Sequence, residues 1–108
     1  MSDLTLTEAD AGRRVAVRVG DIISIQLPEH AGGGYQWTAS HVDDGFVDVA
    51  RKGYETVNPS VGSGGIAVWI VTAEHPGSAR VELIESRSWE QPAQPIHRFA
   101  ITLDISHP

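Results

Sequence analysis

Residues 13–27, RRVAVRVGDIISIQL, contain two short runs of alternating apolar and polar side chains, separated by a Gly-Asp pair. Alternation with a period of two places successive side chains on opposite faces of a β-strand, so the apolar members of each run share one face. The stretch therefore predicts two half-buried strands. Their inward faces would carry Val15, Val17 and Val19, followed by Ile23, Ile25 and Leu27.

The same period recurs in three later segments, GIAVWIVTAEH (65–75), SARVELIES (78–86) and HRFAITLDIS (97–106). The first is apolar on both faces, which is typical of a strand buried between two layers. HPGS at 75–78 combines Pro and Gly, and this turn chemistry predicts a hairpin between the first two of these strands. The residues expected to face inward are Ala67, Trp69, Val71, Ala73, Ala79, Val81, Leu83, Phe99, Ile101, Leu103 and Ile105.

No window shows sustained helical spacing, and short strands punctuated by Gly and Pro indicate an all-β protein. We predict an immunoglobulin-like β-sandwich of about seven antiparallel strands, forming a single domain over residues 1–108. The chain contains no cysteine, so no disulfide can join the sheets. Trp37, at the start of its strand, occupies a position where such sandwiches often bury a tryptophan.

Composition excludes several classes of protein. The chain has 8 basic and 14 acidic residues and a net charge of −6, and its basic residues are scattered. This distribution argues against binding to nucleic acid or to an anionic membrane. No stretch has the length and apolarity of a membrane span, and the N-terminus does not resemble a secretory signal. We expect a monomer that is cytoplasmic as the sequence stands; a periplasmic or secreted mature form with its signal removed is the alternative.

Neither metal binding nor catalysis has a recognisable motif. The five histidines are dispersed, with no pair at the i, i+2 or i, i+4 spacing that metal ligands often show, and we expect solvated or loop positions for them. The Gly-rich segments AGGGY and GSGG lack the Lys-Ser or Lys-Thr of a phosphate-binding loop, and VGSGG lacks the spacing of a nucleophile elbow. We therefore expect no enzyme activity, cofactor or metal. The histidines are His30, His41, His75, His97 and His107.

Three segments interrupt the alternation: His30–Gly34, the GSGG at Gly62–Gly65, and RSWEQPAQP at Arg87–Pro95. In a sandwich of sequential hairpins, connections of this order emerge at one end, as the antigen-binding loops of antibodies do. Two of the segments are rich in glycine, which is also ordinary turn chemistry. The third carries Trp89 among polar neighbours, and this ring could be either a core residue or an interface anchor.

These three segments resemble the motifs of the chagasin family, inhibitors of papain-like cysteine peptidases. That family carries Asn-Pro-Thr-Thr-Gly-aromatic-x-Trp in a first loop, Gly-x-Gly-Gly in a second and Arg-Pro-Trp in a third. The counterparts here are HAGGGYQW (30–37), GSGG (62–65) and RSW (87–89), in the same order and with similar spacing. The resemblance extends from about Val19 to the C-terminus.

The resemblance implies a reversible, competitive inhibitor whose loops form a wedge in the cleft of a papain-like cysteine peptidase. The first loop would sit over the catalytic residues with Tyr35 behind it, the second would run along the non-primed side, and Trp89 would stack on the primed side. Trp37 and Trp69 would belong to the core. The implied binding residues are His30, Ala31, Gly32, Gly33, Gly34, Tyr35, Gly62, Ser63, Gly64, Gly65, Arg87, Ser88 and Trp89.

The first and third loops depart from the family pattern. His30 replaces Asn, Ala31 replaces Pro, and Gly32 and Gly33 replace the two threonines, while Ser88 replaces the proline of the third loop. Glycines approach a surface closely but cost more conformational entropy to order. The alternative to an inhibitor is an immunoglobulin-like binding module that has lost the inhibitory residues.

Overall fold

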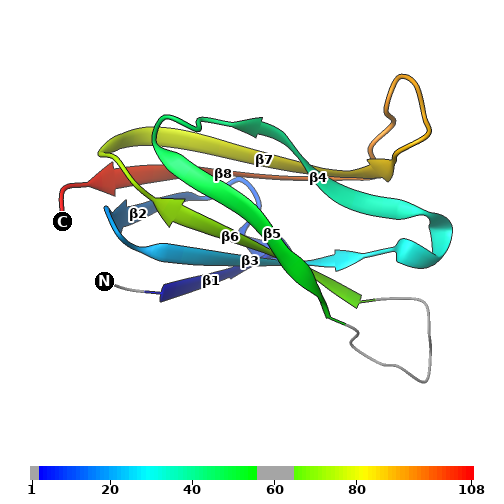
Figure 1. Ribbon diagram of the computed structural model, residues 1–108, viewed down its shortest axis with the longest axis horizontal. Helices are drawn as coiled ribbons and strands as arrows, with labels where there is room; N and C mark the ends of the chain where they lie inside the picture. The colour runs from blue at the N-terminus through cyan, green and yellow to red at the C-terminus, as the bar shows by residue number, and fades with distance from the viewer. Residues whose placement is uncertain (1–2, 56–64) are drawn as a thin grey trace.

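The computed structural model describes residues 3–55 and 65–108 as two stacked β-sheets (Figure 1). One sheet has the strand order β1-β3-β6-β5 and the other β2-β8-β7-β4. Two 3-10 turns, η1 (Glu8–Asp10) and η2 (Ala31–Gly33), interrupt the strands. The strands are β1 (Asp3–Thr7), β2 (Arg14–Arg18), β3 (Ile22–Glu29), β4 (Tyr35–Val42), β5 (Val47–Glu55), β6 (Gly65–Ala73), β7 (Gly77–Arg87) and β8 (His97–Ser106).

The predicted all-β sandwich is confirmed, with eight strands in the described residues where about seven were expected. Most neighbouring strands are antiparallel, but two edge pairs are not: β1 runs parallel to β3, and β2 runs parallel to β8. These two pairings were not predicted, because alternation along one strand does not reveal the direction of its partner.

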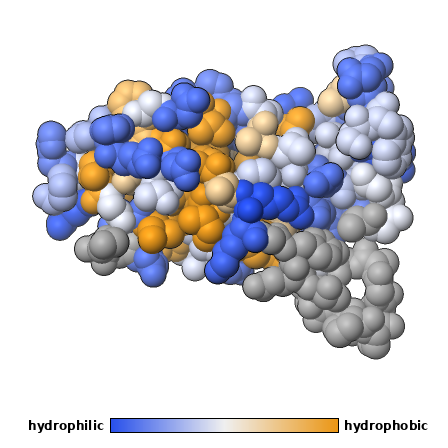
Figure 2. Space-filling model, in the orientation of Figure 1, coloured by the Kyte–Doolittle hydropathy of each residue, from blue (hydrophilic) through white to orange (hydrophobic). Residues whose placement is uncertain are grey.

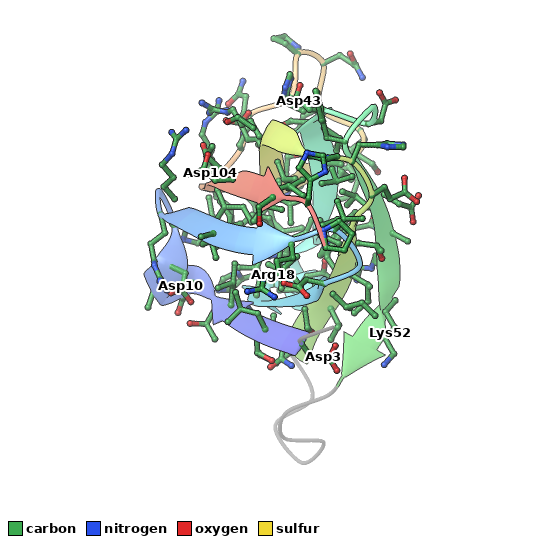
Figure 3. The ribbon with its side chains drawn as sticks, turned by 90° about the vertical axis from the view of Figure 1, so that its left-hand side faces the viewer. Asp3, Asp10, Arg18, Asp43, Lys52 and Asp104 are labelled. Carbon is green, nitrogen blue, oxygen red and sulfur yellow. The ribbon has the colours of Figure 1, made fainter. Side chains whose placement is uncertain are left out.

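The core lies between the sheets, where the inward faces of the strands meet. All the inward-facing residues expected from the alternation are buried except Val19, which is partly buried and packs against the core. Trp37 and Trp69 are buried as predicted. Viewed along the sandwich, charged side chains such as Asp10, Asp43 and Asp104 lie around the outside of the two sheets (Figure 3). The hydrophobic effect thus accounts for the layered arrangement.

The predicted hairpin at HPGS is wrong. β6 pairs with β3 and β5, whereas β7 pairs with β4 and β8, so the Pro76-Gly77 turn carries the chain from one sheet to the other. Both edges of β6 are already occupied and leave no place for β7 beside it. The turn chemistry itself is present: Gly77 has φ +141, and a Cβ there would lie 2.6 Å from the Phe46 ring.

The two ends of the sandwich differ in character. The connections 30–34 and 88–96 lie at one end, while the start of β1 and the C-terminus lie at the other (Figure 1). On the face shown in Figure 2, hydrophobic residues gather over the middle of the sandwich, and the end with the two connections is hydrophilic to neutral. None of the helical turns in residues 3–55 and 65–108 has the length and apolarity needed to cross a membrane.

Candidate functional site

Two of the three predicted loops meet at one end of the sandwich. The first loop (residues 30–34) joins β3 to β4, and the third loop (residues 88–96) joins β7 to β8 (Figure 1). Of the predicted second loop (62–65), Gly65 opens β6 and pairs with Glu29, directly before the first loop. Gly62, Ser63 and Gly64 lie outside the described residues.

The first loop is a turn closed by its own backbone. The carbonyl oxygen of His30 accepts hydrogen bonds from the N–H of Gly33 at 3.1 Å and of Tyr35 at 3.3 Å, and the intervening residues form η2. Gly34 has φ +82, a conformation that residues with a side chain rarely adopt. The glycines predicted a loop that costs conformational entropy to order, and the structure shows a hydrogen-bonded turn here.

The third loop packs directly on the first. The Trp89 ring lies against Gly34, where any Cβ would overlap the indole. The ring nevertheless remains 66% exposed, so the core alternative for Trp89 is wrong. Ser88 is exposed in the turn beside it, and the Gln91–Pro92 peptide bond further along the loop is cis. The Trp89 indole can therefore pack on the backbone at position 34 only because Gly34 has no side chain.

Arg87 joins the two loops through three contacts. Its Nε donates a hydrogen bond to the carbonyl oxygen of Gly33 at 3.0 Å. Its guanidinium carbon lies 4.4 Å from the centre of the Tyr35 ring and 5.8 Å from that of Trp89. Tyr35 in turn approaches Gly33, since a Cβ there would lie 3.1 Å from the tyrosine Cδ2. Hydrogen bonding and cation–π contacts therefore hold the two loops in one arrangement.

A buried glutamate lies at the base of these loops. Glu85 on β7 is 0% exposed, and its carboxylate oxygens lie 3.0 and 3.1 Å from Nδ1 of His30. Nδ1 of His97 lies 2.9 Å from Glu85 Oε1, and the backbone N–H of His30 donates to Oε2 at 2.7 Å. The two imidazole rings stack with their centres 5.5 Å apart. We name His30, Glu85 and His97 the His–Glu–His cluster.

A second buried glutamate anchors the strand that enters the first loop. Glu29 receives two hydrogen bonds from the Arg51 guanidinium, at 2.8 and 2.9 Å, and one from the Trp37 N–H at 2.8 Å. Burial acts against the charged form, but the Arg51 and Trp37 donors outweigh it and hold the pKa of Glu29 below its usual range. The Trp37 indole N–H donates to the carbonyl oxygen of Pro28 at 2.7 Å. Both ends of the first loop are thereby fixed to the sandwich.

Three residues of this end escaped the sequence analysis, Glu29, Arg51 and Glu85, and His97 was expected only at a solvated or loop position. The sequence did contain an indication that the two glutamates are buried, because each occupies the next inward-facing position in the alternating pattern of its strand. Glu29 follows Leu27, and Glu85 follows Leu83, at the next position that faces the core. A carboxylate at such a position needs a buried partner. The histidines are dispersed along the sequence as described, but the fold brings His30, in the first loop, close to His97 at the start of β8.

The predicted first- and third-loop residues thus form one continuous surface. A continuous series of pairwise contacts links Gly33, Gly34, Tyr35, Arg87 and Trp89. Gly32 is exposed in the turn next to them, and of Ala31 only its place in the backbone is described. We call Gly32–Tyr35 together with Arg87–Trp89 the loop edge.

Comparison with known proteins gives a consistent result. The family model for chagasin family peptidase inhibitor I42 matches residues 16–103. Chagasin of Trypanosoma cruzi is 28% identical over 103 residues, which cover 91% of this chain and 94% of chagasin.

Solved structures share the fold. The crystal structure of the cysteine protease inhibitor EhICP2 from Entamoeba histolytica aligns with a TM-score of 0.87 and 21% identity, covering 98% of this chain and 97% of that one. PbICP-C, solved in complex with falcipain-2, aligns with a TM-score of 0.60 and 13% identity, covering 98% and 89%. At such identities these two neighbours establish the architecture alone. The family model, which spans most of the two-sheet body, shows that the chain belongs to the chagasin family of peptidase inhibitors, I42.

Proposed function

We propose that this protein is a reversible, competitive inhibitor of papain-like cysteine peptidases, and that the loop edge enters the active-site cleft. The observation that carries the proposal is the contact between the two loops. Arg87 bonds to Gly33, and Trp89 rests on Gly34, so the edge is assembled before any partner is present. A preorganised surface loses less conformational entropy on binding than a flexible one.

The chemistry of the loop edge suits a wedge that binds without being cleaved. Its tip presents the backbone of Gly32 and Gly33, which carry no side chain and can approach a peptidase surface closely. Trp89 offers a large exposed ring beside Arg87, and these two residue types dominate the binding energy of protein interfaces. The bonds that fix His30, Gly33 and Tyr35 resist the extended conformation that a cleavable substrate adopts in the cleft.

The named relatives support the cysteine-peptidase class. EhICP2 is described as a cysteine protease inhibitor, and PbICP-C was solved in complex with falcipain-2. The fold of this chain matches both along nearly its whole length. A non-inhibitory binding module remains the second candidate, favoured by the absence of threonine side chains at Gly32 and Gly33.

The decisive experiment is a titration of papain with this protein in the presence of a fluorogenic peptide. Competitive inhibition predicts that the apparent KM rises while kcat stays constant. Trp89→Ala should raise the inhibition constant by about 30-fold or more, as expected for an interface anchor worth about 2 kcal/mol. Its melting temperature should change little, because the ring is mostly exposed.

Phe46→Ala provides the matched control, since Phe46 is a partly exposed ring in the β4–β5 connection at the opposite end of the sandwich. It should inhibit like the wild type. No inhibition at micromolar protein would favour the binding-module alternative. Equal inhibition constants for Trp89→Ala and Phe46→Ala would exclude the loop edge as the contact surface.

A further inference from the structure

We propose that the His–Glu–His cluster is a binding site for a divalent transition-metal ion of the zinc class. One ring nitrogen of His30, one of His97 and a carboxylate oxygen of Glu85 all lie within 4.8 Å of one another. Two imidazoles and one carboxylate are a ligand set that proteins use for Zn²⁺ and for neighbouring metals such as Cu²⁺ and Ni²⁺. The inference stands on this cluster alone and does not require the proposed inhibitory function.

The spacing of the donor atoms fits a small ion. A tetrahedral zinc ion with bonds of about 2.0–2.1 Å holds neighbouring ligand atoms about 3.3 Å apart. The distances from the Glu85 oxygens to the two Nδ1 atoms are 2.9–3.1 Å. Both His–Glu spacings are thus close to what a zinc ion requires, and the two histidine nitrogens lie within 4.8 Å of each other.

The electrostatics of Glu85 favour a cation at this place. Its carboxylate is fully buried, and a buried negative charge is costly unless a positive charge compensates it. In residues 3–55 and 65–108, the basic side chains that contact the Glu85 carboxylate are both histidines, which carry no permanent charge. The other buried glutamate, Glu29, has the permanent charge of Arg51 instead. A divalent ion held by His30 and His97 would supply Glu85 with a compensating positive charge, as Arg51 does for Glu29.

The cluster is organised on the protein side and open on the solvent side. The two rings are stacked at an interplanar angle of 26°, with the Nδ1 edge of each directed at the same carboxylate. Both histidine side chains are 55% exposed, so an ion can enter, and water can complete its coordination. His97 opens β8 and His30 opens the first loop, so a bound ion would join the bases of both loops.

The test is isothermal titration calorimetry of the protein, freed of metal with EDTA, against ZnCl₂. We expect one ion per chain. His97→Gln and His30→Gln should each raise the dissociation constant for Zn²⁺ at least tenfold. Even the loss of a residue that only hydrogen-bonds to a metal ligand lowers metal affinity by about 10–100-fold. Titration with CuCl₂ should give tighter binding than with ZnCl₂, following the general order of metal affinities.

His41→Gln is the matched control. His41 also lies 3.0 Å from a carboxylate, Asp43, but in an exposed pair to which the described part of the chain adds no third metal ligand. The dissociation constant of the His41→Gln variant for Zn²⁺ should equal that of the wild type. Glu85→Gln tests the role of the carboxylate. This variant could fail to fold because Glu85 is buried, and in that case the variants of the two exposed histidines still test the proposal. Absence of Zn²⁺ binding up to millimolar metal, or binding that survives either histidine substitution, overturns the proposal.

Discussion

The indole of Trp89 packs against the backbone of Gly34, so the exposed ring of the third loop occupies the space that a side chain at Gly34 in the first loop would need. Gly34 combines this close approach with φ +82, and each property alone would disfavour a side chain. The glycine at this position is therefore required by local structure, whatever the loop binds.

Replacing Gly34 with alanine should both destabilise the protein and weaken inhibition. The positive φ costs roughly 1–2 kcal/mol for an L-residue, and the added methyl group displaces the indole. We expect a fall in the free energy of unfolding of at least about 1 kcal/mol, measured by urea denaturation, and an inhibition constant raised as in Trp89→Ala. Gly45→Ala is the control, because Gly45 has open space around its Cβ position. It should leave both measurements nearly unchanged, and a similar loss in the two variants would refute the contact.

Restoring the family residues in the first loop should tighten inhibition of papain. In the Ala31→Pro, Gly32→Thr, Gly33→Thr variant, the restored side chains lower the entropy lost on ordering the loop and return the missing hydroxyl groups. Neither Gly32 nor Gly33 has positive φ, so the backbone accepts side chains there. We expect a decrease of the inhibition constant of about tenfold, or 1.4 kcal/mol.

The tight point in this variant is position 33, where the new Cβ would lie 3.1 Å from the Tyr35 ring. Gly32→Thr alone is therefore the informative companion variant. If neither variant changes the inhibition constant, the tip of the first loop does not touch the peptidase.

The Glu29–Arg51 pair should be essential for the stability of the end that bears the loops. Glu29→Gln removes the negative charge that faces the partly buried guanidinium of Arg51 at 2.8 Å, and we expect a loss of about 3–5 kcal/mol in the free energy of unfolding. The double variant Glu29→Met, Arg51→Met removes both charges and should recover much of this loss. Urea denaturation of the wild type, Glu29→Met, Arg51→Met and the double variant measures the coupling; additive losses would show that the two residues act independently.

The β4–β5 connection should contribute a stability that disappears in acid. Asp43 accepts a hydrogen bond from the Arg80 N–H at 2.8 Å and lies 3.0 Å from Nε2 of His41. The backbone bond and the His41 contact hold the pKa of Asp43 below its usual value of 3.8. A lowered pKa in the folded state means stability that is present above about pH 4 and lost as the pH falls through the folded value.

Asp43→Asn tests this dependence through melting temperatures at pH 7 and near pH 2.5. The wild type should melt above the variant at pH 7, and the two should converge in acid. A difference that persists undiminished at low pH would mean that the charge of Asp43 is not its source.

Much of the sandwich follows from alternation, because burial of one face imposes a period of two along each strand. The series Ile23, Ile25, Leu27 and the series Phe99, Ile101, Leu103 were both placed correctly on the core. Alternation does not report which strand lies beside which. For this reason the parallel β1–β3 pair and the crossing of the chain between the sheets after β6 were not foreseen.

The loop edge could be predicted as a set of residues, but its contacts could not. Arg87, Trp89 and Gly34 were identified from short motifs, yet their packing depends on how β4 and β7 pair, with Tyr35 opposite Arg87. The His–Glu–His cluster was missed for the same reason. Glu85 is separated from His30 by 55 positions and from His97 by 12, and only the register of the strands brings them together.

The placement of the chain ends matters for the design of fusion proteins and surface-attached forms of this protein. The start of β1 and the C-terminus both lie at the end of the sandwich opposite the first and third loops (Figure 1). A carrier domain, fluorophore or surface tether appended there would point away from a captured protease, so immobilised or fused versions should retain full access to their target.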